Sequence, residues 1–228
     1  KGQPVVFIRP KISKEREFND EPNLLDQLIK EPEPSIITSH PQFGLTCLSH
    51  HMRLEAFKLN NFWVYLDAKR IKARNVKSEI DLQLKEFEKD VEEIKCIILD
   101  SWDSTIIDHR NILKLIDSEY KDTPIIIMAN YIGFQLNFTF DLSKLNSKLQ
   151  ILHLQAMQRN KVREFVSKYN IEKNIEKEDV VVAKVVRDLE ALNIHRTPFN
   201  CLTLLKALER EFNEDLVNRT NMIKAVLF

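Results

Sequence analysis

The chain has 228 residues, 43% of them hydrophobic, which is enough for one large domain or for a core with a small appendage. Its 34 basic and 34 acidic residues balance, which excludes a global charge that would draw it to nucleic acid or to an anionic membrane. Cys47, Cys96 and Cys201 are widely spaced and lie in apolar runs, so we expect reduced core thiols and no disulfide framework.

No apolar stretch approaches the roughly 20 residues that span a bilayer, and the N-terminus has no apolar signal-peptide core. We therefore expect a cytoplasmic protein with no membrane partner. The chain begins at Lys1 and stops at Phe228 inside an apolar helical pattern, so we expect a piece of a longer polypeptide. Only three glycines occur, far below the usual share of about 7%, which predicts that helices and strands fill most of the chain.

The first part of the chain alternates helical and strand patterns. Residues 1–22 predict an irregular arm with a short strand at 5–8. The Glu-Pro-Glu-Pro stretch at 31–34 forbids a helix and leads into a buried strand. In chain order the patterns predict a helix at 23–30, a strand at 35–38, a helix at 47–59, an aromatic strand at 62–67 and an amphipathic helix at 77–93.

The second part predicts more strands and then helices alone. Near-continuous apolar runs at 96–99, 124–129 and 151–154 are typical of strands covered on both faces. Helical patterns occupy 106–119, 159–169, 177–192, 198–212 and 214–228, and a small hairpin fits the Asn-Phe-Thr-Phe segment within the irregular stretch 131–148. We therefore predict an α/β fold, with a doubly wound, parallel, five-stranded sheet and a small helical lid. The expected divisions are an arm at 1–22, a core at 23–156 and a lid at 157–228.

The turn after the strand at 35–38 has the length of a phosphate-binding loop but lacks its charge. The template is glycine, four variable residues, glycine, lysine and then serine or threonine, and here these positions hold Ser39, Gly44, Leu45 and Thr46. Leu45 cannot supply the positive charge that the lysine brings to the β- and γ-phosphates. Pro41 also removes a backbone N–H donor. The loop predicts weak nucleotide binding and hydrolysis that is absent or very slow.

Asp100 ends an apolar strand, and Asp103 follows three positions later. A carboxylate at a strand end is typical of the Walker B position, which holds the magnesium of a bound nucleotide. We therefore predict Asp100 and Asp103 as catalytic residues, and Thr46 and Asp100 as Mg²⁺ ligands if nucleotide binds. The alternative is that Asp100 caps the turn into the next helix. The prediction requires the turn after Ile37 to lie beside Asp100, on an adjacent strand at the mouth of the sheet.

Asn130 ends the strand predicted at 124–129. A polar side chain at this position can orient a water molecule or contact a γ-phosphate. An asparagine at a strand-to-loop turn also has a purely structural explanation, so both alternatives stay open.

The order of phosphate loop, aromatic strand, acidic strand, polar strand, fifth strand and helices resembles the NTPase core of the STAND class. It is most similar to NACHT-like modules, within the AAA+ group of P-loop NTPases, and the resemblance covers about residues 23–228. Residues 154–166 are similar to the segment in which the family leaves its fifth strand for the helical lid. Thr197-Pro198-Phe199 resembles the family's proline motif, whose proline packs near the adenine, although Pro198 also suits a first helical position.

The resemblance implies an ATP or ADP switch, with Mg²⁺, that couples nucleotide state to homo-oligomerisation in a defence or signalling protein. Its partners would be effector and sensor domains of the same longer chain. The implied nucleotide contacts are Ser39, Gly44, Leu45, Thr46, Asn130 and Pro198. Three functions stay open: a degenerate regulatory module with little or no hydrolysis, a nucleotide-free interaction scaffold with no cofactor, and an active ATPase in which another cation replaces the lysine. The candidate cations are Arg53, Lys69, Arg70 and Arg159.

Two further patterns are weaker. Cys47 and His51 share a helical face near His50 and Glu55, where a metal site can be imagined, but the spacing of a zinc finger or metalloprotease is absent. We expect Cys47 in the core and both histidines at the surface. The basic residues at 69–74 suit a solvated helix start better than a nucleic-acid surface, so nucleic acid is not indicated.

Overall fold

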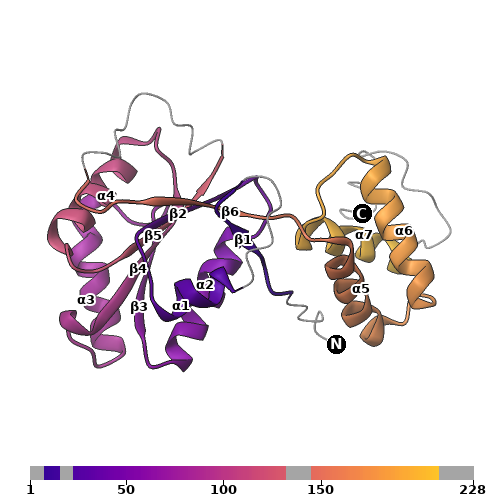
Figure 1. Ribbon diagram of the computed structural model, residues 1–228, viewed down its shortest axis with the longest axis horizontal. Coiled ribbons are helices and arrows are strands. Elements are labelled where there is room, and N and C mark those ends of the chain that lie inside the picture. The colour runs from indigo at the N-terminus through magenta and orange to yellow at the C-terminus, as the bar shows by residue number, and fades with distance from the viewer. Residues whose placement is uncertain (1–7, 16–22, 132–144, 211–228) are drawn as a thin grey trace. The chain divides into compact units, whose positions relative to one another are not determined.

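The structure is a computed structural model that describes residues 8–15, 23–131 and 145–210, and it divides the chain into two compact units (Figure 1). We call them the α/β unit (Ile12–Pro41 and Leu45–Gln155) and the helical unit (Lys1–Lys11, Gln42–Gly44 and Ala156–Phe228). The hairpin predicted in 131–148, the helix predicted at 214–228 and most of the strand predicted at 5–8 lie outside the described residues.

The α/β unit is built on a six-stranded sheet in the order β1-β6-β2-β5-β4-β3. Five strands run parallel, as predicted: β2 (Ser35–Ser39), β3 (Phe62–Asp67), β4 (Ile94–Trp102), β5 (Ile125–Asn130) and β6 (Gln150–Leu154). The predicted total of five is wrong, because β1 (Ile12–Ser13) adds an antiparallel pair to β6 at one edge. A two-residue strand is too short to leave a recognisable pattern in the sequence.

The order of the strands corrects one expectation about the site. We expected the turn after Ile37 and Asp100 to follow adjacent strands, but β5 lies between β2 and β4. Two inter-strand spacings, about 10 Å, therefore separate the two strands. Similar isoleucine-rich runs form β4 and β5, and such runs do not specify which strand will be the neighbour of β2. Because all three strands are parallel, their carboxyl ends still share one edge of the sheet.

Helices cover both faces of this sheet, as the apolar strands predict (Figure 1). α2 (Leu45–Lys58) packs on one face with α1 (Leu24–Lys30) beside it, and α3 (Val76–Glu86) and α4 (Ile107–Glu119) cover the other face. The helix predicted at 77–93 ends early. Glu88 adopts a left-handed backbone with a φ of 52°, and a capping box between Asp90 and Glu93 begins the separate turn η2 (Val91–Glu93). A second short turn, η1 (Ala73–Asn75), precedes α3.

The helical unit contains α5 (Arg159–Lys173), α6 (Glu178–Ala191) and α7 (Pro198–Arg210). Its core is separate from that of the sheet and is formed by apolar side chains of all three helices, among them Phe165, Val185 and Leu204. Across the described residues, no helix combines the length and the apolar character that a bilayer crossing requires.

Asparagines provide much of the left-handed backbone in a chain that has three glycines. Asn23, Asn60, Asn174 and Asn193 all have positive φ, and Asn174 is the C-cap of α5. Asparagine tolerates this conformation better than most residues, because its short amide bonds to the nearby backbone. Helix ends can therefore form without the usual C-terminal glycine.

Side chains occupy the outer edge of β3, which is the last strand of the sheet. The amide oxygen of Gln83 accepts the Tyr65 backbone N–H at 3.1 Å, and its amide nitrogen donates to the Tyr65 carbonyl at 2.8 Å. Arg53 Nε donates to the Trp63 carbonyl at 3.1 Å. These bonds satisfy backbone groups that would otherwise bind a further strand.

We predict that Gln83→Leu lowers the free energy of unfolding by about 2–4 kcal/mol, because the Tyr65 N–H and carbonyl lose their partners in a half-buried position. Urea denaturation of the full chain measures this change. Leu82→Ala, at an adjacent residue that is 60% exposed, is the control and should change stability by less than about 0.5 kcal/mol. Equal stability of Gln83→Leu and the unmodified chain would contradict the prediction.

Candidate functional site

The carboxyl edge of the parallel strands brings together several of the predicted residues. Ser39 ends β2 and pairs with Asn130, which ends β5. Ser39 is fully buried, with its hydroxyl donating to the His40 carbonyl at 2.9 Å, whereas Asn130 is exposed. The structure therefore places Asn130 beside the first residue of the phosphate loop.

The loop after Ser39 has two residues with left-handed backbone and leads directly into a helix. Gln42 has a φ of 69° and Gly44 a φ of 93°, a conformation that favours glycine. α2 begins at Leu45, two residues earlier than predicted, so Leu45 and Thr46 lie in its first turn. Thr46 is exposed and Leu45 is half-buried. The loop keeps the strand, glycine and helix of the template while offering no side-chain cation at Leu45.

Asp100 lies in a β-bulge near the end of β4. The register with β5 shifts between Leu99 and Trp102, and Ser101 has a φ of 58°. The Asp100 side chain is buried, with Oδ1 accepting the Ser101 N–H at 2.7 Å and Oδ2 accepting the Tyr65 hydroxyl at 2.9 Å. Bulges redirect side chains in this way next to functional sites. Both carboxylate oxygens are thus engaged within the protein.

Tyr65 is held in the neutral form that this bond requires. Burial raises the pKa of its hydroxyl, and the negative charge of Asp100 raises that pKa further. The ring of His50, from α2, lies 4.6 Å from the ring of Tyr65, measured between centroids. A residue from the phosphate-loop helix therefore packs against the partner of Asp100.

Asp67 lies level with Asp100 on the neighbouring strand and was not among the predicted site residues. The two residues are register partners at the ends of β3 and β4. Asp67 Oδ1 accepts the Lys69 N–H at 3.1 Å, and its Oδ2 pairs with Arg70 Nε at 3.2 Å. In the sequence, the position of this acid at the end of the aromatic strand could have identified it.

Asp103 holds the turn before α4, the structural role that the sequence suggested as the alternative for Asp100. Its Oδ1 accepts both the backbone N–H and the hydroxyl of Thr105, at 2.8 and 2.7 Å, in the turn before α4. Its own N–H donates to Nδ1 of the buried His109 at 3.1 Å, and burial lowers the pKa of His109. These bonds hold the turn, so Asp103 stays only a prediction as a catalytic residue.

The candidate substitute cations are dispersed. Arg53 is bonded to the edge of β3, and Arg70 is paired with Asp67. Lys69 is exposed after β3, and Arg159 begins α5 in the helical unit. None of these positions is the one that lysine holds in the template.

Pro198 begins α7 in the helical unit. The Thr197 hydroxyl accepts the Asn200 N–H at 3.1 Å, which makes Thr197 an N-cap and Pro198 the first helical residue. This local geometry accounts for the Thr-Pro pair, and a contact between Pro198 and adenine stays a prediction.

The expectation of three core thiols is wrong for Cys47. This residue is exposed in the first turn of α2, because the helix begins earlier than the pattern indicated, while Cys96 and Cys201 are buried and free. Within the part of the chain that the structure describes, no group of three or more His, Cys, Asp or Glu side chains could hold a metal ion.

A hydrogen-bonded cluster beside the loop was missed by the sequence analysis. His153 Nδ1 on β6 lies 2.9 Å from the Thr38 hydroxyl and 2.9 Å from the Tyr131 hydroxyl. The Tyr131 ring contacts the His40 ring, with centroids 4.7 Å apart, and its backbone N–H donates to the Ser39 carbonyl at 2.8 Å. The cluster fixes the start of the phosphate loop through three strands. In the sequence, the members of this cluster are polar residues near the ends of apolar strands, and that pattern could have identified them.

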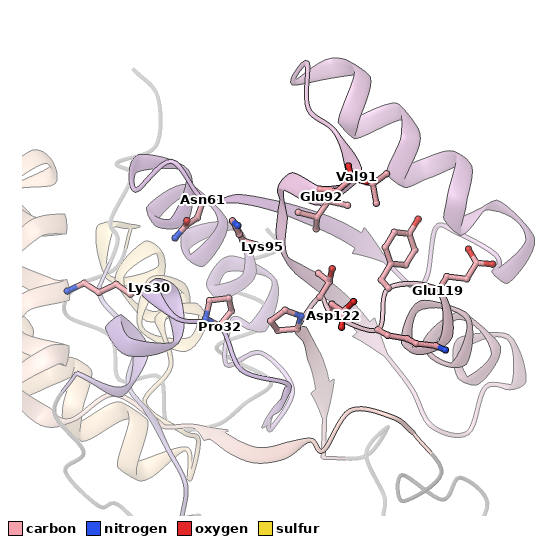
Figure 2. Close-up of a pocket in the computed structure, with 13 residues that line it drawn as sticks. Lys30, Pro32, Asn61, Val91, Glu92, Lys95, Glu119 and Asp122 are labelled. Atoms are coloured by element: carbon pink, nitrogen blue, oxygen red, sulfur yellow. The ribbon is translucent and has the colours of Figure 1, made fainter.

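A pocket of about 570 Å³ lies at the opposite, amino edge of the sheet (Figure 2). Pro32, Ile94 and Pro124 mark this edge, because they precede or begin β2, β4 and β5. Its charged lining is mixed and consists of Lys30, Lys95, Lys121, Glu92, Glu119 and Asp122. The lining has three basic and three acidic side chains, so it has no excess of positive charge for a phosphate.

Comparison with known proteins establishes the fold. No protein-family model and no curated protein matches the sequence. Solved structures do match. The Aeropyrum pernix ORC1 protein in complex with DNA has a TM-score of 0.56 at 13% identity, over 88% of this chain and 63% of that one. The ORC2 protein of the same organism, in ADPNP–ADP complexes, has a TM-score of 0.52 at 12% identity, over 89% and 64%.

A third match is the A156S mutant of Thermotoga maritima RuvB, with a TM-score of 0.51 at 13% identity over 88% of this chain and 64% of that one. The chain shares the fold of these three structures. It spans slightly less than two thirds of the length of these three structures. The fold assignment therefore rests on the whole α/β arrangement and not on the strand adjacency that we expected.

We predict that Tyr65→Phe lowers the free energy of unfolding by about 1–3 kcal/mol at pH 8, because the buried Asp100 carboxylate loses a hydrogen-bond donor. The ordinary pKa of tyrosine is 10.0, and folding raises it at Tyr65. The stability from the neutral hydroxyl is therefore complete below about pH 10 and declines as the pH rises further. Urea denaturation should show the difference between the two proteins narrowing above about pH 10. A difference that stays constant would contradict the assignment.

Proposed function

We propose that this chain is a degenerate nucleotide-binding module that holds ATP or ADP weakly and hydrolyses it little or not at all. It acts as a regulatory or oligomerisation switch in a longer STAND/NACHT-like protein of defence or signalling. The observation that carries the proposal is that two charged positions of the site are altered together. Leu45 stands where the template has lysine, and the Asp100 carboxylate is engaged by Tyr65 and Ser101.

Several features support retained nucleotide binding. The Aeropyrum pernix ORC2 structure holds ADPNP and ADP in this fold. Here Gly44 keeps its left-handed backbone, and the 14-residue helix α2 follows at once with no acidic residue in its first turn. The unpaired N–H groups at such a helix start favour phosphate. Asn130 stands beside the loop as a further polar contact. The bound species would be ATP or ADP, with Mg²⁺ reaching Thr46.

Two features support slow or absent hydrolysis. Charge-assisted hydrogen bonds from lysine to phosphate contribute about 1.5–3 kcal/mol each, and leucine provides none. Asp100 is 1% exposed and each of its oxygens already accepts a hydrogen bond, so Mg²⁺ or its water would have to enter a buried site to reach it. Leucine weakens the hold on the phosphates, and the Asp100 carboxylate is already engaged by the protein. Hydrolysis depends on both groups, so we expect turnover to fall more than binding.

The partners in this proposal come from the family resemblance. Residues 154–166 and the Thr197-Pro198-Phe199 segment support a STAND-like passage from the sheet to a helical lid. On that basis effector and sensor domains of the same chain flank the module, which forms a homo-oligomer on activation. The matched ORC1 structure contains DNA, but equal numbers of basic and acidic residues give this chain no general attraction to nucleic acid. DNA is therefore not part of the proposal.

Calorimetric titration with ATP and with ADP, each with Mg²⁺, tests the proposal together with a phosphate-release assay. We expect measurable binding of at least one nucleotide and no phosphate release above the background rate. Binding with ordinary turnover that disappears in Asp100→Ala would instead identify an active ATPase. Absence of binding would identify a nucleotide-free scaffold.

We predict that Leu45→Lys raises the affinity for ATP by about tenfold to a hundredfold, because it restores a charge-assisted contact to the phosphates. Titration calorimetry in the presence of Mg²⁺ measures the change. Leu45→Met is the matched control, since it keeps a long apolar side chain at the same position. Equal affinities of the two variants would show that this position does not face a phosphate.

A further inference from the structure

A small pocket with aromatic walls lies on the α2 face of the sheet, beside the edge strand β3. Its volume is about 230 Å³, and it is lined by Phe57, Phe62, Trp63 and Phe87 together with Arg53 and His50. The ring of Phe87 lies 5.4 Å from that of Phe62 and 6.1 Å from that of Phe57, measured between centroids. The walls therefore come from α2, β3 and the residue that follows α3.

The size of the pocket matches one aromatic ring with a short substituent. A cavity of about 150 Å³ lined by apolar side chains is sufficient to bind benzene. The remaining space is too small for a second ring, and aromatic walls favour an aromatic guest through edge-to-face contacts. Phe57 is 56% exposed and Leu54, which also lines the pocket, is 55% exposed, so a ligand there would cover apolar surface that now faces water.

Arg53 gives the pocket a positive charge with unused donors. Its Nε donates to the Trp63 carbonyl at 3.1 Å, its Nη2 donates to the Gln83 amide oxygen at 3.3 Å, and its guanidinium lies 5.4 Å from the Phe87 ring centroid. Nη1 donates no hydrogen bond to any residue that the structure describes. A carboxylate matches such a guanidinium in charge and geometry.

The partial burial of the Arg53 guanidinium also favours an anionic ligand. Burial lowers the pKa of Arg53, and the negative charge of Glu86 acts against that effect. A partly desolvated cation gains more from a new anionic partner than a fully hydrated one. The structural bonds of Arg53 fix its orientation, which reduces the entropy that a ligand contact would lose.

We propose that this pocket is a binding site for a small aromatic carboxylate, with the ring against Phe57 and Phe87 and the carboxylate on Arg53. The site is separate from the phosphate loop. His50 nevertheless lines the pocket and packs on Tyr65, whose hydroxyl donates to Asp100. A ligand in the pocket thus contacts a residue that touches the partner of Asp100.

Nuclear magnetic resonance of the full chain tests the proposal, without nucleotide, so that the result is independent of the proposed function. The probe is 3-phenylpropionate, and the matched neutral probe is 3-phenylpropionamide. The chain has two tryptophans, and their indole N–H signals serve as reporters. Trp63 lines the pocket, whereas Trp102 is at the far end of β4, about 20 Å along the strand from the register partner of Trp63.

We expect 3-phenylpropionate to shift the Trp63 signal saturably, with a Kd on the order of 1 mM for a ligand of this size, and to leave Trp102 unchanged. The amide should bind at least about tenfold more weakly, because it lacks the charge. Arg53→Gln should remove this preference, and Phe57→Ala should weaken both ligands about tenfold. Leu59→Ala is the control, because Leu59 is 48% exposed near the end of α2 and does not line the pocket.

Three results would overturn the proposal: no saturable Trp63 shift, equal shifts at both tryptophans, or equal binding of the acid and the amide. If Arg53→Gln fails to fold, Phe57→Ala at its exposed position still tests the ring contact. Sedimentation of the ligand-free chain tests one other occupant. A dimer that Phe57→Ala dissociates, together with no binding of 3-phenylpropionate, would show that a second copy fills the pocket and would also overturn the proposal.

Discussion

A carboxylate that water cannot reach must obtain its hydrogen bonds from the protein, and the carboxyl edge of this sheet is arranged around that requirement at Asp100. The bulge in β4 turns the Ser101 N–H onto one oxygen, and the edge strand β3 brings the Tyr65 hydroxyl to the other. These bonds join β3 to β4 at the level of Asp67 and place Tyr65 against His50 of α2. Asp100 is thereby a structural junction between two strands and a helix.

The loop after β2 can be compared with the phosphate-loop template position by position. The loop retains the features that depend on backbone, namely Gly44 and the start of α2, and it lacks the feature that depends on a side-chain charge. The acid is retained, but its oxygens are used internally. α2 begins at the end of this loop and carries His50, so one helix connects the loop to the junction at Asp100.

Features that depend on neighbouring residues could be predicted from the sequence, whereas features that depend on contacts between distant residues could not. Both ends of the strand at 62–67 were predicted correctly, because its aromatic and β-branched residues form a strand pattern within the segment itself. The bond between Tyr65 and Asp100 joins residues 35 positions apart and has no local signature, nor does the insertion of β5 between β2 and β4. Asn130 and Asp100 were predicted as site residues because each ends an apolar run, and Ser39 because it falls on the first position of the phosphate-loop template. The bulge that redirects Asp100 was not, since Ser101 adopts a positive φ that serine seldom has.

The side-chain cover of β3 restricts how copies of this unit can associate. Gln83 and Arg53 take the backbone positions at Tyr65 and Trp63 through which an incoming polypeptide would extend the sheet. At the other boundary, β1 offers only two residues in antiparallel orientation. Addition of a foreign strand at these positions of β3 is thereby disfavoured, which protects the sheet from edge-to-edge aggregation.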